Sequence, residues 1–151
     1  MPKHPPVQFH FLAPCPLKAR TRLKAWINSL FKKHGRKLES LQIIFCSDAY
    51  LLDLNRQFLK HDYYTDILSF PLSDPGVPLA AEIYISVDRV KDNAGNLGCP
   101  FRQEIHRVIF HGALHFLGFR DKTLKDQKKM REMMEKAQDQ QKIQEQQKKK
   151  K

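Results

Sequence analysis

The pattern of apolar and polar residues along the chain switches between the spacing of strands and the spacing of helices. Period-two or continuous apolar runs predict strands, and apolar residues that recur every three or four positions predict helices with one buried side. The predicted strands are residues 7–11, 41–46, 66–70 and 82–87, and the predicted helices are residues 17–34, 47–58, 88–94, a helix that follows Pro100, and a last helix from Thr123. This order predicts an α/β fold: a single compact domain with a small mixed β-sheet of about four strands and about five helices.

Two of the predicted helices have an apolar side that we expect to pack against the sheet. In residues 17–34 this side consists of Leu23, Trp26, Ile27, Leu30 and Phe31. Ser47 is placed to cap the next helix, in which Leu51, Leu54 and Phe58 are expected to point inward. In the last helix Met130, Met133 and Met134 are expected to pack on the core.

The length of the chain, 151 residues, is enough for one domain with a substantial core. We expect residues 1–136 to form this domain and residues 137–151, rich in Gln and Lys, to be a disordered tail or a frayed helix end. No stretch approaches the ~20 apolar residues that cross a bilayer, and the N-terminus lacks the apolar segment of a signal peptide. Three widely spaced cysteines without a C-x-x-C pair are typical of reduced thiols in a cytoplasmic protein.

The formal charge of the chain is +11, and the tail accounts for only part of it. Residues 137–151 contain five lysines and two acidic residues, so the remaining body keeps 22 basic against 14 acidic residues. A basic domain favours a polyanionic partner, because neutralising phosphates releases condensed counterions. Many basic proteins bind no nucleic acid, so charge alone leaves the partner open.

The segment from His111 to Asp121 contains the clearest chemical pattern. Two histidines at i and i+4, His111 and His115, share one helix face and can converge on one ion. Gly118 is a candidate helix stop, after which a turn could bring Asp121 beside the two rings. Two nitrogens and one carboxylate oxygen leave an open position, as in a catalytic zinc site. The spacing predicts one zinc ion per chain, with manganese or another divalent ion as an alternative; histidine pairs at this spacing also occur in helices without metal.

The same segment resembles the YbeY family of metal-dependent endoribonucleases. The family pattern H-G-x-L-H-x-L-G-[YF]-x-H matches residues 111–119, but Asp121 stands where the pattern has its last histidine. Upstream, residues 54–58 match L-N-x-x-[YF], although Leu59 replaces the arginine that follows in the family. Residues 65–70 match T-[DN]-[VI]-L-S-F, and residues 81–85 resemble the family strand G-[DE]-I-x-I.

The resemblance implies a function as well as a fold. It implies a single-strand-specific endoribonuclease that acts in the maturation of ribosomal RNA (the 16S 3′ end) and in ribosome quality control in a bacterial cytoplasm. Expected partners are therefore RNA, above all ribosomal RNA and the ribosome, with no membrane and no DNA. Zinc in an open site would make a bound water acidic enough to attack a phosphodiester near neutral pH.

Beyond the metal-bound water, the catalytic groups are unknown, with Asp66 and Arg107 as candidates. Asp66 could accept a hydrogen bond from a metal-bound histidine, or it could simply end a strand. Arg107, one turn before His111, could clamp a phosphate or be solvated. The candidates for substrate binding are Arg56, Lys60, Thr65 and Arg107. If the arginine replaced by Leu59 binds phosphate in the family, either Arg56 or Lys60 substitutes for it here or the activity is reduced.

Two other classes of function remain open. A zinc peptidase with an H-E-x-x-H motif uses the Glu after its first histidine as general base, but Gly112 occupies that position here. A non-catalytic protein that binds RNA or the ribosome, with a structural metal, is the second alternative.

Overall fold

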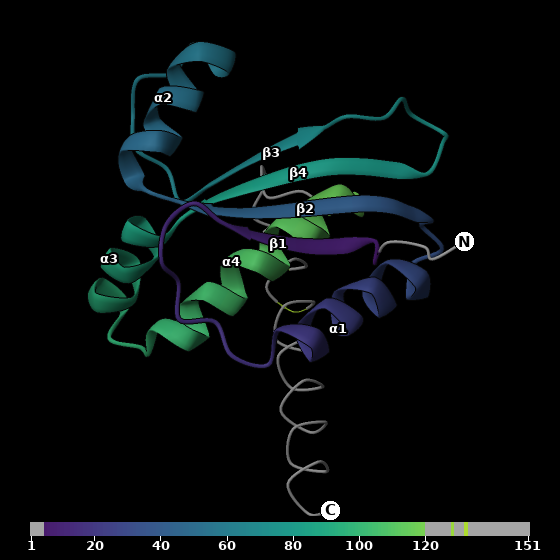
Figure 1. Cartoon of the computed structure of the whole chain (residues 1–151), viewed down its shortest axis with the longest axis horizontal. Helices are drawn as coiled ribbons and strands as arrows, with labels where there is room; N and C mark the ends of the chain where they lie inside the picture. Colours follow the sequence, from purple (N-terminus) through teal and green to yellow (C-terminus); the bar gives the residue numbers. More distant parts are fainter. Residues whose placement is uncertain (1–4, 120–127, 129–131, 133–151) are drawn as a thin grey trace, which may run out of the picture.

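Four strands form one sheet with four helices around it in the part of the chain that the structure, a computed structural model, describes: residues 5–119, 128 and 132 (Figure 1). The elements are β1 (Val7–Phe11), α1 (Arg20–Lys33), β2 (Leu38–Cys46), α2 (Asp48–Leu59), β3 (Ile67–Pro71), β4 (Leu79–Ser86), α3 (Val87–Leu97) and α4 (Phe101–Phe116). The predicted single α/β domain with a mixed four-stranded sheet is confirmed. The fifth helix, with its three methionines, and the tail were predicted for a segment outside the described residues.

The sheet has the order β1-β2-β4-β3. The first three strands in this order are parallel, and β3 pairs with β4 in the antiparallel direction. Ile43 of β2 stands between Phe9 of β1 and Ile83 of β4. Because β3 pairs only with β4, it forms one edge of the sheet, and the loop between these two strands turns back along that edge.

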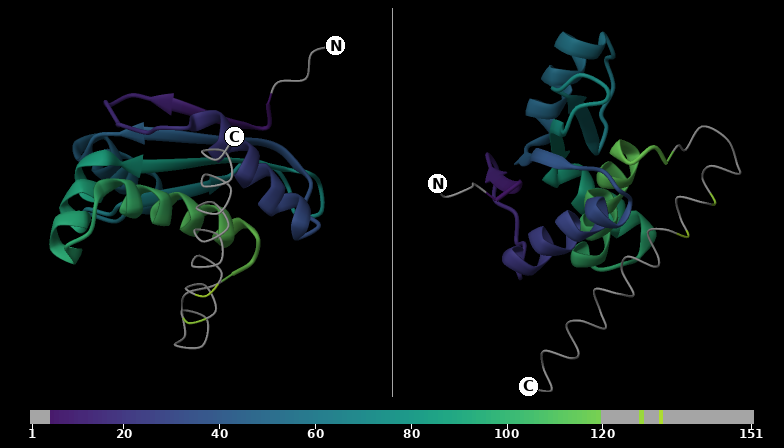
Figure 2. Two further views of the ribbon diagram at one scale, coloured as in Figure 1. Left: turned by 90° about the horizontal axis from the view of Figure 1, so that it is seen from below. Right: turned by 90° about the vertical axis from the view of Figure 1, so that its right-hand side faces the viewer.

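The two faces of the sheet are covered unequally (Figures 1 and 2). Helices α1, α3 and α4 lie on one face, whereas α2 lies alone on the other. Alternate side chains of the central strands point into the larger core on the first face, because successive side chains in a strand point to opposite faces; they include Leu41, Ile43, Phe45, Ala81, Ile83 and Ile85. Under α2, a smaller cluster is formed by Cys46, Leu51 and Leu68. No helix of the described part is long and apolar enough to cross a membrane.

Helices α2 and α3 begin at the ends of neighbouring parallel strands and are capped in the same way. The hydroxyl of Ser47 accepts a hydrogen bond from the amide of Tyr50 at 3.1 Å, which confirms Ser47 as the predicted cap. Ser86 accepts from the amide of Arg89, also at 3.1 Å. The Ser86 hydroxyl itself donates to Oδ1 of Asp48, the first residue of α2, at 3.0 Å. This hydrogen bond links the starts of the two helices. Serine caps of this kind satisfy amides that the first helical turn leaves without partners.

Several predicted boundaries were wrong by a few residues. Strand β2 begins at Leu38 rather than at residue 41, and α1 covers Arg20–Lys33 rather than residues 17–34. Helix α3 was expected to end at residue 94 but continues to Leu97, and Gly98 ends it at φ +68°. Gly95, the residue after the predicted end, lies inside the helix, because a glycine there costs only about 1 kcal/mol relative to alanine.

The apolar side predicted for the first helix is confirmed, whereas that of the second is only partly correct. Leu23, Trp26, Ile27, Leu30 and Phe31 of α1 are all buried. In α2, Leu51 is buried and Leu54 half-buried, but Phe58 is 63% exposed. The ring of Phe58 contacts that of Phe70 in β3 edge-to-face, with centroids 6.0 Å apart, and most of its surface stays exposed.

Candidate active site

The histidine pair occupies the C-terminal end of α4. His111 is half-buried and His115 is exposed one turn later, so both rings lie at the edge of the buried face of the helix. The helix ends at Phe116, and Gly118 takes φ +93° while its amide donates to the His115 carbonyl at 3.1 Å. The prediction that Gly118 stops this helix is confirmed. A residue with a side chain is strained at this φ, so glycine suits the position.

Gly112, between the two histidines, brings α4 unusually close to the sheet. A Cβ atom at this position would lie 2.8 Å from Cδ1 of Ile67 and 3.0 Å from Cδ1 of Ile83. Only a residue without a side chain therefore permits this contact with β3 and β4. The same contact places the histidine helix beside the strand that begins directly after Thr65 and Asp66.

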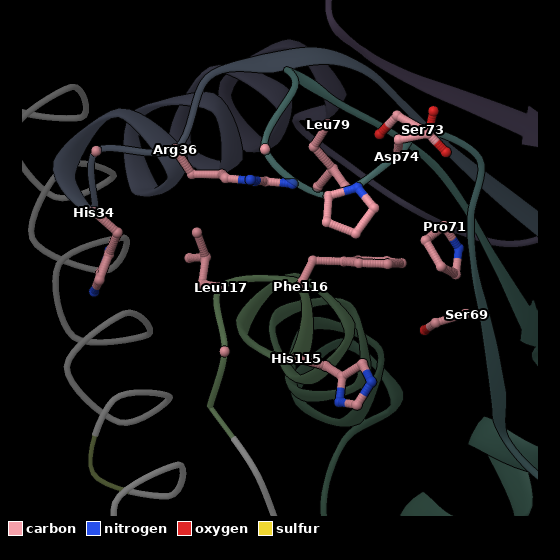
Figure 3. A pocket seen from close by; sticks show the side chains of 14 residues that line it. His34, Arg36, Ser69, Pro71, Ser73, Asp74, Leu79, His115, Phe116 and Leu117 are labelled. Carbon is pink, nitrogen blue, oxygen red and sulfur yellow. The ribbon is translucent and has the colours of Figure 1, made fainter.

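A pocket of about 620 Å³ opens beside His115 (Figure 3). Three segments that are far apart in the sequence line it: the turn after α1, strand β3 with the loop that follows it, and the end of α4. Ser69 contributes from β3, while His34 and Arg36 contribute from the turn after α1. The sequence analysis did not include His34 or Arg36. The one sequence signal that could have drawn attention to them is a long basic stretch around α1.

The predicted metal site is described only in part. His111 and His115 are in place on one face of α4, whereas the third predicted ligand, Asp121, lies outside the described residues. Within the described part, no three side chains of His, Cys, Asp or Glu are grouped so that they could hold an ion. Two imidazoles one turn apart, half-buried to exposed, fit a divalent metal that prefers nitrogen and oxygen donors. The metal itself stays a prediction.

Arg107 forms an ion pair within α4. Its Nε and Nη2 atoms donate to Oε1 and Oε2 of Glu104, each at 2.6 Å. Glu104 is 1% exposed, so this paired geometry compensates a buried carboxylate. The hydrogen bonds with Glu104 raise the pKa of Arg107, with a smaller contribution from the charge of Asp66. Arg107 thus has a structural partner, and its predicted contact with phosphate stays a prediction.

Asp66 and Thr65 lie where the chain enters β3. The carboxylate of Asp66 accepts a hydrogen bond from the amide nitrogen of Asn93 at 3.4 Å, and its carbonyl accepts from the amide of Ser86 at 3.0 Å. The hydroxyl of Thr65 donates to the carbonyl of Ile67 at 3.4 Å. These bonds fix the start of β3 against α3 and the end of β4. The predicted roles of Asp66 toward a histidine and of Thr65 toward a substrate stay predictions.

The other two predicted substrate contacts lie at the end of α2. Arg56 pairs with Asp62 in an exposed ion pair, whose hydrogen bond raises the pKa of Arg56. Lys60 ends the helix at φ +59°. Neither residue lines the pocket beside His115. Thr65, Asp66 and Arg107 do not line it either, so the predicted contacts of all these residues with substrate stay predictions.

Comparison with known proteins identifies the family to which the chain belongs. The sequence profile of the family described as endoribonuclease YbeY matches residues 16–142 of the chain. The chain belongs to this family. Its relatives named endoribonuclease YbeY include that of Cytophaga hutchinsonii, 46% identical over 76% of this chain and 80% of the relative. The relative from Flavobacterium psychrophilum is 36% identical over 83% of this chain and 89% of its own length.

The fold of the chain is also similar to that of a solved structure. The solution structure of TM1509 from Thermotoga maritima matches with a TM-score of 0.59 and 29% sequence identity, over 86% of this chain and 89% of that chain. Within the YbeY family pattern, this chain departs at Leu59 and Asp121. Leu59 is 41% exposed in the last turn of α2, so an apolar side chain stands at the surface where the pattern has a cation.

Proposed function

We propose that this chain is a metal-dependent endoribonuclease that cleaves single-stranded RNA in the cytoplasm. Its proposed role is in maturation of ribosomal RNA, including the 16S 3′ end, and in ribosome quality control. The observation that carries the proposal is membership in the YbeY family together with the histidine pair of α4, of which His115 lines an open pocket. The formal charge of +11 supports an RNA substrate, since RNA is a polyanion.

His111, His115 and Asp121 would hold the metal, with zinc as the first choice and manganese or another divalent ion as alternatives. When bound, such an ion supplies an acidified water and polarises a phosphoryl oxygen. The side chains of this protein would do the rest. The pocket beside His115 would receive the strand, and the Arg107–Glu104 pair would neutralise the buried carboxylate on the same helix as His111.

A peptidase function is disfavoured by a specific observation. The position that supplies the general base in H-E-x-x-H peptidases is Gly112, and its Cα lies so close to Ile67 and Ile83 that no side chain fits without displacement. The experiment below distinguishes an endoribonuclease from a non-catalytic protein that binds RNA or the ribosome.

The test compares the unmodified protein with His111→Ala, using metal analysis and cleavage of a labelled single-stranded RNA. We expect one metal ion per chain and metal-dependent cleavage in the unmodified protein. His111→Ala should lose both while it still binds RNA. Equal cleavage by both preparations would mean that the activity belongs to a contaminant, and the non-catalytic alternative would then be favoured.

A second pair of variants tests the departure at the third ligand. Asp121→Ala should weaken metal binding strongly, whereas Asp121→His should retain it because histidine is what the family pattern has there. If Asp121→Ala binds zinc as tightly as the unmodified protein, another residue completes the site.

A further inference from the structure

The start of the chain carries basic residues without any acidic ones. Residues 1–38 contain nine lysines and arginines and no acidic residue; the first acid is Glu39. This stretch includes all of α1 and ends in the turn that lines the pocket beside His115. A strongly one-signed surface attracts a polyanion, and here it leads directly to the proposed active site.

Arg36 brings that charge into the pocket. Gly35, at φ +69°, turns the chain after α1, and the amide of Arg36 donates to the carbonyl of Phe31 at 3.0 Å. The side chain of Arg36 then extends across the pocket toward Leu79 and Phe116 (Figure 3). Its Nε atom is buried and has no hydrogen-bond partner among the residues that the structure describes. A guanidinium that is incompletely hydrogen-bonded is costly, so an acceptor supplied to it by a ligand in the pocket would be favourable.

Arg36 is one of two arginines whose buried Nε has no partner in the described part of the chain, and the other, Arg89, differs from it in its ion pairing. Arg56, Arg89 and Arg107 each pair with a carboxylate. Arg36 forms no ion pair with any residue that the structure describes, although Asp74 lines the same pocket. A guanidinium in a pocket with an unused donor matches the geometry of a phosphate, which accepts two parallel hydrogen bonds from it.

We infer that Arg36 forms a phosphate-binding subsite for the RNA backbone, an inference that rests on the proposed endoribonuclease function. Figure 3 shows Phe116 between Arg36 and His115, so Arg36 contacts a phosphate other than the one that is cleaved. Ser73 lines the same pocket, and its hydroxyl accepts from the amide of Ala80 at 3.0 Å, which leaves its own proton available for a phosphate oxygen. Arg36 is therefore a positioning residue that holds the strand in register with the histidines.

The chain offers a matched control for the test. Lys37 follows Arg36 directly, is exposed and does not line the pocket, so Lys37→Gln removes the same charge from nearly the same place. The binding of a fluorescent single-stranded RNA is measured by anisotropy with a metal chelator present. Arg36→Gln should weaken binding roughly ten-fold, as expected for loss of charged hydrogen bonds, and Lys37→Gln roughly two-fold. Asp74→Asn should tighten binding, because it removes a carboxylate that repels phosphate.

Steady-state cleavage with metal gives a second readout. Arg36→Gln should raise KM and leave kcat within about two-fold, since it binds a phosphate that does not react. Arg36→Lys should be intermediate, because it keeps the charge and loses the planar fork. Thermal unfolding checks the fold of each variant; loss of an unpartnered donor should not lower the Tm.

Three outcomes would overturn the subsite. One is an equal loss of RNA affinity in Arg36→Gln and Lys37→Gln. The second is a loss in kcat alone. The third is displacement of the RNA by polyglutamate as effectively as by unlabelled RNA, which would indicate a protein carboxylate as the ligand. Failure of the proposed function gives a different result: no metal-dependent cleavage by the unmodified protein, whatever the binding data show.

Discussion

Gly112→Ala changes one hydrogen into a methyl group at the closest contact between α4 and the sheet. The new Cβ would lie 2.8 Å from Cδ1 of Ile67 and 3.0 Å from Cδ1 of Ile83. A Cβ atom essentially never lies within 3.0 Å of an atom in a residue that is not its neighbour in the chain. Either α4 or one of the two isoleucine side chains must therefore move. Ile83 is fully buried and Ile67 is half-buried. We therefore expect Ile67, the less confined of the two, to shift.

Two opposing effects set the magnitude. Alanine is favoured over glycine inside a helix by about 1 kcal/mol. Overpacking a tight core costs about 1–3 kcal/mol. The free energy of unfolding should therefore fall by about 1 kcal/mol, which lowers the Tm by roughly 2–4 °C in a protein of this size.

The control is the same substitution at Gly95 of α3. This glycine is exposed, and a Cβ there would meet no atom within 4 Å, so Gly95→Ala should raise the Tm. Adding Ile67→Val to Gly112→Ala removes the Cδ1 atom that makes the closest contact and should restore part of the loss. Thermal melts of the four proteins, followed by circular dichroism, measure these shifts. A Tm increase for Gly112→Ala like that of Gly95→Ala would refute the close-contact argument.

Three further predictions follow from buried groups. Arg107→Gln leaves the Glu104 carboxylate, which is 1% exposed, without its cation and should lower the free energy of unfolding by about 3 kcal/mol in denaturant titrations. Adding Glu104→Gln should recover part of this loss. An unchanged denaturation midpoint in Arg107→Gln would contradict a structural role for the ion pair. Burial raises the pKa of the Cys15 thiol to about 11 and that of Cys46 to about 12. At pH 8, a disulfide reagent should therefore react quickly only with half-buried Cys99 and with all three after unfolding; two fast thiols in the folded protein would be inconsistent with this. Because the folded protein holds the protons of Cys15 and Cys46 more tightly than the unfolded chain, the free energy of unfolding should fall as the pH rises above about 8.5, which melts at pH 8 and pH 10 can check.

Much of the fold is predictable from the sequence because burial imposes a period on it. The five apolar residues of α1 are buried as predicted, and the alternating strands lie where their apolar residues indicate. Periodicity shows which side of a helix is apolar, but not how far its partner extends. Phe58, on the apolar side of α2, contacts the ring of Phe70 in β3 but stays mostly exposed.

The site was predictable only where it is local in sequence. The spacing of His111 and His115 determines their common face on any helix, and Gly118 ends that helix as expected. Arg36 reaches the same pocket from a segment far away in the chain, and nothing in its own neighbourhood indicates that contact. The sequence analysis left Arg107 as a phosphate clamp or a solvated residue and did not include its ion pair, because no sequence rule places the carboxylate of Glu104 in the core.

The order of the strands has a consequence for how quickly the protein folds. Val7 pairs with Leu41, and Leu41 pairs with Ala81, so both parallel pairings join segments that are distant along the chain. Such contacts require large loops to close before they stabilise anything, which slows folding, whereas the β3–β4 hairpin can form early. The pocket beside His115 combines residues from the turn after α1, from the hairpin and from α4. During refolding, RNA binding should therefore return only with the last kinetic phase, after most of the helical signal.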